Sequence, residues 1–251
     1  MRRPRALRMQ ELEDRFAPKT LSLSVLIAVE EEADGNYAQL QACLAPLANA
    51  ARRGVEIELI LATTHANERL VSIAEPFNGK IVELDEGRGA RLREAAREAT
   101  GEWVLILRQN SVLQRGWDAT LMVFASQERN RERGAVYRYK APGESAADRF
   151  AQRSMRFRNR WLISVAGVQG LVIRRRFLAH LGSVPALSRC EDMMLARELG
   201  MGRLAIFDTE IEVHRSPTED RWSYRLLSAL RLILFTFRVP AKWLQLLPVD
   251  K

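Results

Sequence analysis

Hydrophobic residues in the first half of the chain gather in short, almost continuous runs, with more polar segments between them. The runs cover residues 21–29, 55–62, 80–84 and 103–107. They are rich in branched side chains, as is typical of strands buried on both faces of a sheet. Helices are predicted between them, over residues 37–53, 68–74 and 88–100. Strands and helices that alternate in this way predict a mostly parallel, doubly wound α/β sheet flanked by helices.

The second half of the chain has a less regular pattern. Strands are predicted over residues 134–139, 169–174 and 204–213, and helices over residues 148–163, 191–199 and 221–237. The last of these helices is amphipathic, and Pro240 ends it. We therefore divide the chain into a basic N-terminal tail (1–19), an α/β domain (20–215) and C-terminal amphipathic, membrane-proximal helices (216–251).

Composition and charge narrow the class of protein. The chain has 251 residues, 47% of them hydrophobic, and its 39 lysines and arginines exceed its 31 acidic residues by 8. This composition excludes a disordered chain and fits one large domain. The surplus of positive charge favours an anionic partner, which is a phosphorylated ligand, an anionic membrane surface or nucleic acid.

Cysteine content and local hydrophobicity predict a cytoplasmic protein without a transmembrane helix. Cys43 and Cys190 are too few for a disulfide framework and stand in no zinc-type cluster. The tail 1–19 has no apolar stretch before its acidic residues, so it lacks the middle of a secretory signal. The most apolar stretch, 226–237, is shorter than the roughly 20 residues that span a bilayer.

Ligands of doubly wound sheets bind beyond the carboxyl ends of the strands. In this chain the corresponding loops follow Val29, Ala62, Leu84 and Leu107. The first strand is not followed by GxGxxG, and the chain contains no GxxxxGK(S/T), GxSxG or HExxH. Dinucleotide-binding and P-loop proteins are therefore disfavoured.

Three segments in a fixed order carry a resemblance to a known family. They are residues 87–107 (GRGARLREAAREATGEWVLIL), 167–181 (GVQGLVIRRRFLAHL) and 190–200 (CEDMMLARELG). Their order and spacing resemble the family 2 glycosyltransferases of the GT-A fold, above all the small bacterial subgroup "transferase 2, rSAM/selenodomain-associated". The resemblance covers residues 21–237. It implies a Rossmann-like GT-A domain that takes a nucleotide-diphospho-sugar as its donor.

The resemblance also implies roles for residues in the second half. Glu191 and Asp192 match the position of the base that activates the acceptor, with Asp192 as the catalytic base and Glu191 as its support. Gln169 stands where the subgroup has the last residue of GDQ, and we expect it to position the acceptor or the donor. Arg221 and Trp222 resemble an Arg-Trp pair near the end of the catalytic region. Without the resemblance, an acidic pair at a helix start is also explained by the helix dipole.

The chain departs from the family at two donor-binding positions. Ala62 stands where the family has an acidic residue that holds the nucleobase. Arg108, Gln109 and Asn110 replace the DxD-like triplet that binds a divalent metal, Mg²⁺ or Mn²⁺. Asn110 offers only a neutral oxygen and Arg108 would repel a cation, so these residues argue against a metal cofactor.

Arginines can take the place of the metal at a diphosphate. The guanidinium of Arg108 can bind phosphate oxygens with two hydrogen bonds. Arg88 and Arg91 lie at the start of a predicted helix, where free backbone N–H groups also favour anions. With Val29 and Glu30 after the first strand, these arginines form the predicted donor site. The alternative is a solvated helix face held by ordinary pairs between arginine and glutamate.

Two predicted helices concentrate basic and aromatic residues. In helix 148–163 the arginines recur at intervals of four, three and four residues, beside three aromatic residues: Arg149, Arg153, Arg156 and Arg160, with Phe150, Phe157 and Trp161. Helix 221–237 combines arginine with leucine and aromatic residues. Such helices bind membrane surfaces, or they pack on a core with a solvated basic face. We expect peripheral contact with an anionic membrane and no nucleic-acid binding, because no recognition motif accompanies the charge.

Two functions are compatible with this sequence. The first is a glycosyltransferase on the inner face of the cytoplasmic membrane that transfers a sugar from a nucleotide sugar to a lipid or membrane-proximal glycan acceptor, without a metal. The second is a catalytically inactive GT-A module that binds a membrane protein of glycan or lipid synthesis. Ala62, Arg108 and Asn110 motivate the second hypothesis.

Overall fold

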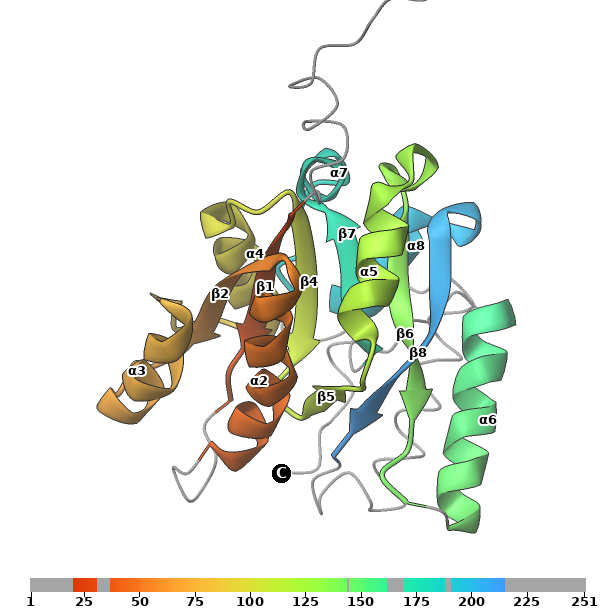
Figure 1. The fold of residues 1–251 in the computed structure, drawn as a ribbon, viewed down its shortest axis with the longest axis horizontal. Helices are drawn as coiled ribbons and strands as arrows, with labels where there is room; N and C mark the ends of the chain where they lie inside the picture. Colours follow the sequence, from red (N-terminus) through yellow and green to blue (C-terminus); the bar gives the residue numbers. More distant parts are fainter. Residues whose placement is uncertain (1–19, 31–36, 144, 162–168, 188–190, 215–251) are drawn as a thin grey trace, which may run out of the picture.

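The structure is a computed structural model that describes residues 20–30, 37–143, 145–161, 169–187 and 191–214. An eight-stranded sheet crosses the molecule in the order β3-β2-β1-β4-β7-β6-β8-β5 (Figure 1). The predicted N-terminal tail 1–19 and the predicted C-terminal helices 216–251 lie outside the described residues. Within the described ranges, no helix combines the length and apolar character needed to cross a membrane.

The first half of the chain confirms the predicted alternation of strands and helices. Its strands are β1 (Leu21–Ala28), β2 (Val55–Thr63), β3 (Lys80–Glu83) and β4 (Trp103–Arg108), and its α-helices are α2 (Ala38–Ala50), α3 (Glu68–Ala74) and α4 (Arg88–Glu98). The pairs β3/β2, β2/β1 and β1/β4 are all parallel. Each strand begins at the predicted residue and ends within one residue of the prediction.

The second half gives the sheet a mixed character. Its strands are β5 (Ser111–Leu113), β6 (Gly134–Lys140), β7 (Leu171–Arg174) and β8 (Leu204–Val213), and its α-helices are α5 (Trp117–Ser126), α6 (Ala146–Trp161), α7 (Arg175–His180) and α8 (Glu191–Leu199). Short 3-10 helices cover Ala51–Arg53, Glu75–Phe77, Glu128–Asn130 and Met201–Arg203. Strand β7 is antiparallel to β4 and β6, and β5 is antiparallel to β8. The parallel prediction therefore holds for the first half and for the β6/β8 pair.

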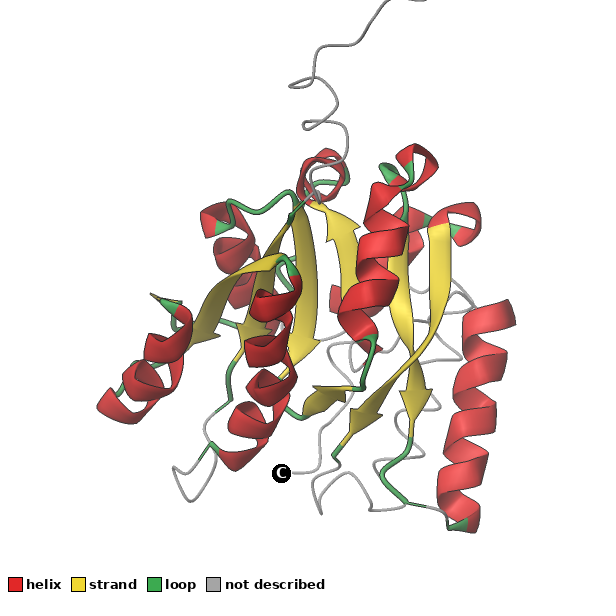
Figure 2. Cartoon of the chain, in the orientation of Figure 1, coloured by secondary structure: helices red, strands yellow, loops and turns green. Residues whose placement is uncertain are grey.

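Helices cover both faces of the sheet, as Figure 2 shows. Buried side chains of α2, α3 and α5 form one core with the strands. Buried side chains of α4, α7 and α8 form a second core on the opposite face. Neighbouring residues of β1 and β4 point alternately into the two cores; Leu105 belongs to the first and Ile106 to the second. This two-sided burial explains why these strands are apolar throughout.

The strand order contains a topological switch between β1 and β4. From β1 the chain moves outward to β2 and β3, and then returns to form β4 on the other side of β1. In doubly wound sheets, a crevice forms at such a point beyond the carboxyl ends of the strands. The segments that meet there follow Ala28 of β1 and Arg108 of β4.

Candidate functional site

The loops after β1 and β4 are joined by the side chain of Gln109. The N–H of Glu30 donates to Oε1 of Gln109 at 2.7 Å, and Nε2 of Gln109 donates to the carbonyl of Glu30 at 3.2 Å. Gln109 thus acts as a bridge between two loops of the switch point. In the sequence, Gln109 is recognisable only as a substitution in the DxD-like triplet.

Arg91 of α4 holds the backbone at the end of β1. Its Nη1 donates to the carbonyl of Val29 at 2.6 Å, and the N–H of Val29 donates to the carbonyl of Ala62 at 2.8 Å. Ala62 is fully buried in the sheet. Burial lowers the pKa of Arg91, and the nearby carboxylate of Glu30 opposes that shift. Val29, Glu30, Ala62 and Arg91 are therefore neighbours at the ends of β1 and β2, and their role in donor binding stays a prediction.

Arg88, the first residue of α4, forms a buried ion pair with Glu191, the first residue of α8. Their side chains are 9% and 3% exposed. Burial lowers the pKa of Arg88 to about 9, and the positive charge of Arg108 acts in the same direction. Arg88 still carries its charge at neutral pH. Its Nη2 has no hydrogen-bond partner in the part of the chain that the structure describes.

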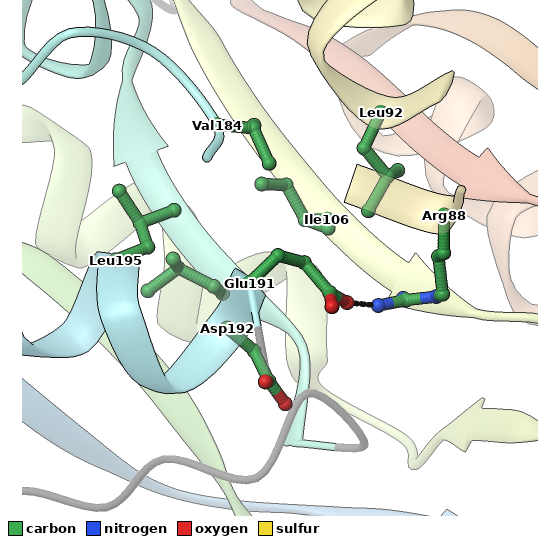
Figure 3. Close-up of a pocket in the computed structure, with 8 residues that line it drawn as sticks. Arg88, Leu92, Ile106, Val184, Glu191, Asp192 and Leu195 are labelled. Carbon is green, nitrogen blue, oxygen red and sulfur yellow. Dashed lines mark ion pairs between the residues drawn. The ribbon is translucent and has the colours of Figure 1, made fainter. Parts of the chain in front are cut away.

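The ion pair borders a small pocket between α4 and α8 (Figure 3). Its other walls are mainly apolar, formed by Leu92, Ile106, Leu171, Val184 and Leu195. The pocket has a volume of about 20 Å³, which is room for about one water molecule. A nucleotide sugar does not fit in this space. Figure 3 shows Glu191 reaching toward Arg88, whereas the carboxyl group of Asp192 points in another direction.

Asp192 lies beside Arg108, the last residue of β4. Nη2 of Arg108 is 4.0 Å from Oδ2 of Asp192. The side chain of Arg108 is 33% exposed and that of Asp192 is 16% exposed, so both are more accessible than Arg88 and Glu191. The fold therefore places the predicted base next to one of the predicted diphosphate ligands. Asp192 also lines the pocket beside Glu191.

The residues after β4 do not fit a divalent metal. Arg108 contributes a cation, Gln109 is bonded to Glu30, and Nδ2 of Asn110 donates to the carbonyl of His214 at 2.8 Å. Oδ1 of Asn110 is buried and has no hydrogen-bond partner within the described residues, but it is a neutral oxygen. Hard divalent cations prefer carboxylates. The described ranges also contain no group of three His, Cys, Asp or Glu side chains that could hold a metal.

Gln169, another predicted residue, is not among the residues that line this pocket. Gln169 is fully buried, and its Nε2 donates to the carbonyl of Tyr137 in β6 at 3.0 Å. It lies against the sheet, and its positioning role stays a prediction. Arg221 and Trp222 lie outside the described residues.

Gly89 helps to build the site and is not among the predicted site residues. Its N–H donates to the carbonyl of Leu187 at 2.9 Å. A Cβ atom at position 89 would collide with backbone atoms of Pro185 and Leu187. The segment before α8 can thus approach α4 only because residue 89 is glycine. The available signal was a glycine in the first turn of a predicted helix, where helix propensity alone disfavours it.

Comparison with known proteins identifies the fold of the chain. No protein-family model matches the chain, and no curated protein sequence matches it. Among solved structures, S. aureus TarS matches with a TM-score of 0.60 and 16% sequence identity, over 86% of this chain and 39% of TarS. The mannosyltransferase PcManGT from Pyrobaculum calidifontis, solved with GDP-Man and Mn²⁺, matches with a TM-score of 0.60 and 16% identity, over 88% of this chain and 64% of PcManGT.

A third match covers nearly the whole of both chains. Glucosyl-3-phosphoglycerate synthase from Mycobacterium tuberculosis was solved with Mn²⁺, UDP and glucosyl-3-phosphoglycerate. It matches with a TM-score of 0.59 and 15% identity, over 96% of this chain and 87% of the synthase. The chain therefore has the GT-A fold, as the sequence resemblance implied. It spans well under half of the length of TarS and just under two thirds of PcManGT. The subgroup stays a prediction.

Proposed function

We propose that the chain is a glycosyltransferase that transfers a sugar from a nucleotide-diphospho-sugar donor to a hydroxyl group of an acceptor. The observation that carries this proposal is the position of Asp192, which lies 4.0 Å from Arg108 at the switch point of a GT-A sheet. A carboxylate and a partly exposed guanidinium at this edge provide the two groups that the reaction needs: a base for the acceptor and a cation for the leaving diphosphate.

The proposed reaction is a single displacement at C1 of the donor sugar. The acceptor oxygen forms a bond to C1 while the bond between C1 and the diphosphate oxygen breaks. The leaving nucleoside diphosphate keeps the electron pair, and the proton of the acceptor hydroxyl moves to the carboxylate of Asp192. Because attack and departure occur on opposite sides of C1, the configuration at C1 is inverted.

The arginines have different roles in this proposal. Arg108 contacts the diphosphate directly, since its side chain is the most exposed of the three. Arg91 holds the end of β1 in place through Val29. Arg88 fixes the first turn of α8 through Glu191, which is how Glu191 supports Asp192. Diphosphate binding then needs no metal, because a guanidinium both neutralises phosphate oxygens and donates hydrogen bonds to them.

The acceptor in this proposal is a lipid or a membrane-proximal glycan on the cytoplasmic side of the membrane. The excess of 8 positive charges on the chain favours an anionic partner such as this membrane surface. The neighbours PcManGT and glucosyl-3-phosphoglycerate synthase were solved with nucleotides of different bases. Ala62 stands where the family has the acidic residue that holds the nucleobase, so we propose no preference between uridine and guanosine.

A second candidate function has an observation of its own. The pocket beside Glu191 has room for about one water molecule, and the triplet after β4 contains no carboxylate. Both features also suit an inactive GT-A module that binds a membrane protein of glycan or lipid synthesis. The two candidates differ in whether the chain binds nucleotides.

Thermal unfolding with nucleotides tests the proposal. We expect UDP or GDP, at about 100 times its dissociation constant, to raise the Tm by about 5–10 °C. The shift should be the same with Mn²⁺ and with EDTA. Arg108→Met should abolish the shift, whereas Arg97→Met, which removes an exposed arginine of α4, should keep it. If no nucleotide or nucleotide sugar shifts the Tm of the wild type, the glycosyltransferase proposal is wrong.

A further inference from the structure

Helix α6 concentrates the positive charge of the chain. Its 16 residues, Ala146–Trp161, include five arginines and one acidic residue, Asp148. The helix thus has a net charge of +4, which is half of the net charge of +8 on the whole chain. An amphipathic helix with this charge density is typical of a contact with an anionic surface.

The inner face of α6 is identified by its packing. Ala151 and Met155 pack against a small apolar cluster formed by Tyr139, Ala141 and Val213. Residues four positions apart lie on the same face of a helix. This face fastens α6 to the ends of β6 and β8.

Away from this packed face, α6 carries an exposed aromatic side chain next to exposed arginines. Phe150 is 74% exposed, which is a larger fraction than for any other exposed large hydrophobic residue in the described ranges. Arg149 and Arg153 are also exposed, and they lie four residues apart on one face. An exposed phenylalanine next to arginines is the combination that binds at the boundary between lipid headgroups and acyl chains.

Ser145 caps the N-terminus of α6. The N–H of Asp148 donates to Oγ of Ser145 at 3.1 Å, and the N–H of Ser145 donates to Oδ2 of Asp148 at 3.2 Å. This reciprocal pair of bonds is a capping box, which fixes the first turn. The capping box therefore stabilises the first turn of α6, which carries Arg149 and Phe150, and Arg153 follows in the next turn.

The strand directions place the start of α6 at the same edge of the sheet as the candidate site. Strand β7 is antiparallel to β4, and β6 is antiparallel to β7, so β6 and β4 run in the same direction. Helix α6 begins shortly after Lys140 ends β6, and Arg108 ends β4. Figure 1 shows α6 at the outer flank of the molecule, beside the ends of β6 and β8.

We propose that α6 docks the protein on the surface of an anionic lipid bilayer. Arg149 and Arg153 contact the phosphate groups of the lipids, and Phe150 inserts between headgroups. A bilayer on this flank lies close to the edge that holds Arg108 and Asp192, so that an acceptor at the lipid surface reaches them. This link to the acceptor rests on the proposed function, whereas bilayer binding by α6 does not.

Cosedimentation of the full chain with vesicles tests this surface. We expect binding to vesicles of phosphatidylglycerol and phosphatidylcholine, and little binding to phosphatidylcholine alone. Loss of one arginine near an anionic bilayer weakens binding by about five-fold, so Arg149→Ser with Arg153→Ser should weaken it by about 25-fold. Phe150→Ser should weaken it by about ten-fold through the loss of apolar insertion.

Matched variants elsewhere on the surface make the result specific to α6. Arg69→Ser with Arg97→Ser removes two exposed arginines of α3 and α4, and Val123→Ser removes an exposed apolar side chain of α5. These controls should bind like the wild type, and all variants should keep the wild-type Tm. Unchanged binding of the α6 variants, or stronger binding of the wild type to short duplex DNA than to the vesicles, would overturn the proposal. The nucleotide-induced Tm shift is measured without lipid, so it tests the proposed function separately.

Discussion

Arg88 and Glu191 form an almost fully buried ion pair that joins the first turns of α4 and α8. The pair lies against apolar side chains, including Leu92 and Leu195. Burying two charges costs several kcal/mol each, and their mutual attraction compensates for that cost only while both are present. The pair therefore constrains the first turn of α8, from which Asp192 projects. Each buried charge is compensated only while the other charge is present.

Removing one partner of this pair should destabilise the protein more than removing both. We expect Glu191→Gln to lower the free energy of unfolding by about 3–5 kcal/mol, because Arg88 would remain buried without its counter-ion. The double variant Arg88→Met with Glu191→Leu should lie within about 2 kcal/mol of the wild type, since apolar replacements suit this pocket. Urea unfolding measures both values. A double variant that is as unstable as Glu191→Gln would contradict the role of the pair.

Replacing Asp192 should separate catalysis from donor binding. Asp192→Asn keeps the size of the side chain but removes its capacity to accept a proton. We expect kcat for sugar transfer to fall by about 10²–10⁴-fold, the usual contribution of a general base, while the nucleotide-induced Tm shift persists. Glu198→Gln, which changes an exposed carboxylate of the same helix, is the control and should leave kcat unchanged. Equal turnover by Asp192→Asn would exclude Asp192 as the base.

Long apolar runs made much of the fold predictable from sequence. Strands β1 and β4 are buried on both faces, so their residues have to be apolar throughout, and this pattern is visible without a structure. Strand β5 and helix α7 span only three and six residues, too few for a periodic pattern. Helix α5 was missed even though Trp117, Leu121 and Phe124 have helical spacing.

The contacts within the candidate site were less predictable. The resemblance to family 2 glycosyltransferases implied that Asp192 and Arg108 belong to one site, and the structure brings them to 4.0 Å from each other. The sequence could not show that Glu191 binds Arg88, because that contact depends on how α8 packs beside α4. The same holds for Gln109, whose bonds to Glu30 depend on the parallel pairing of β1 with β4.

A methyl group at position 89 should disturb the approach of the segment before α8 to α4. We expect Gly89→Ala to lower the free energy of unfolding by about 1–3 kcal/mol, as is typical of overpacking, because its Cβ would meet backbone atoms of Pro185 and Leu187. Gly202→Ala is the control, since a Cβ there meets no atom within 4 Å. Chemical unfolding compares the two. Equal stability of Gly89→Ala and the wild type would show that this segment can shift at little cost.

Protonation of Glu58 should make the protein less stable in acid. Burial alone would raise the pKa of Glu58, but hydrogen bonds from Ser24, Thr100 and Lys80 outweigh it and lower the pKa from 4.5 to about 2.

The carboxylate therefore stabilises the fold above pH 4.5, and this contribution disappears as the pH falls from about 4.5 to about 2. The shift corresponds to at most about 3 kcal/mol. We expect Glu58→Gln to be less stable than the wild type at pH 7, with a difference that shrinks below pH 4.5 in urea unfolding. Glu56→Gln, at an exposed position of the same strand, should show no such convergence. A stability difference for Glu58→Gln that is independent of pH would mean that the ionised carboxylate is not the stabilising form, because a purely steric effect of the substitution does not titrate.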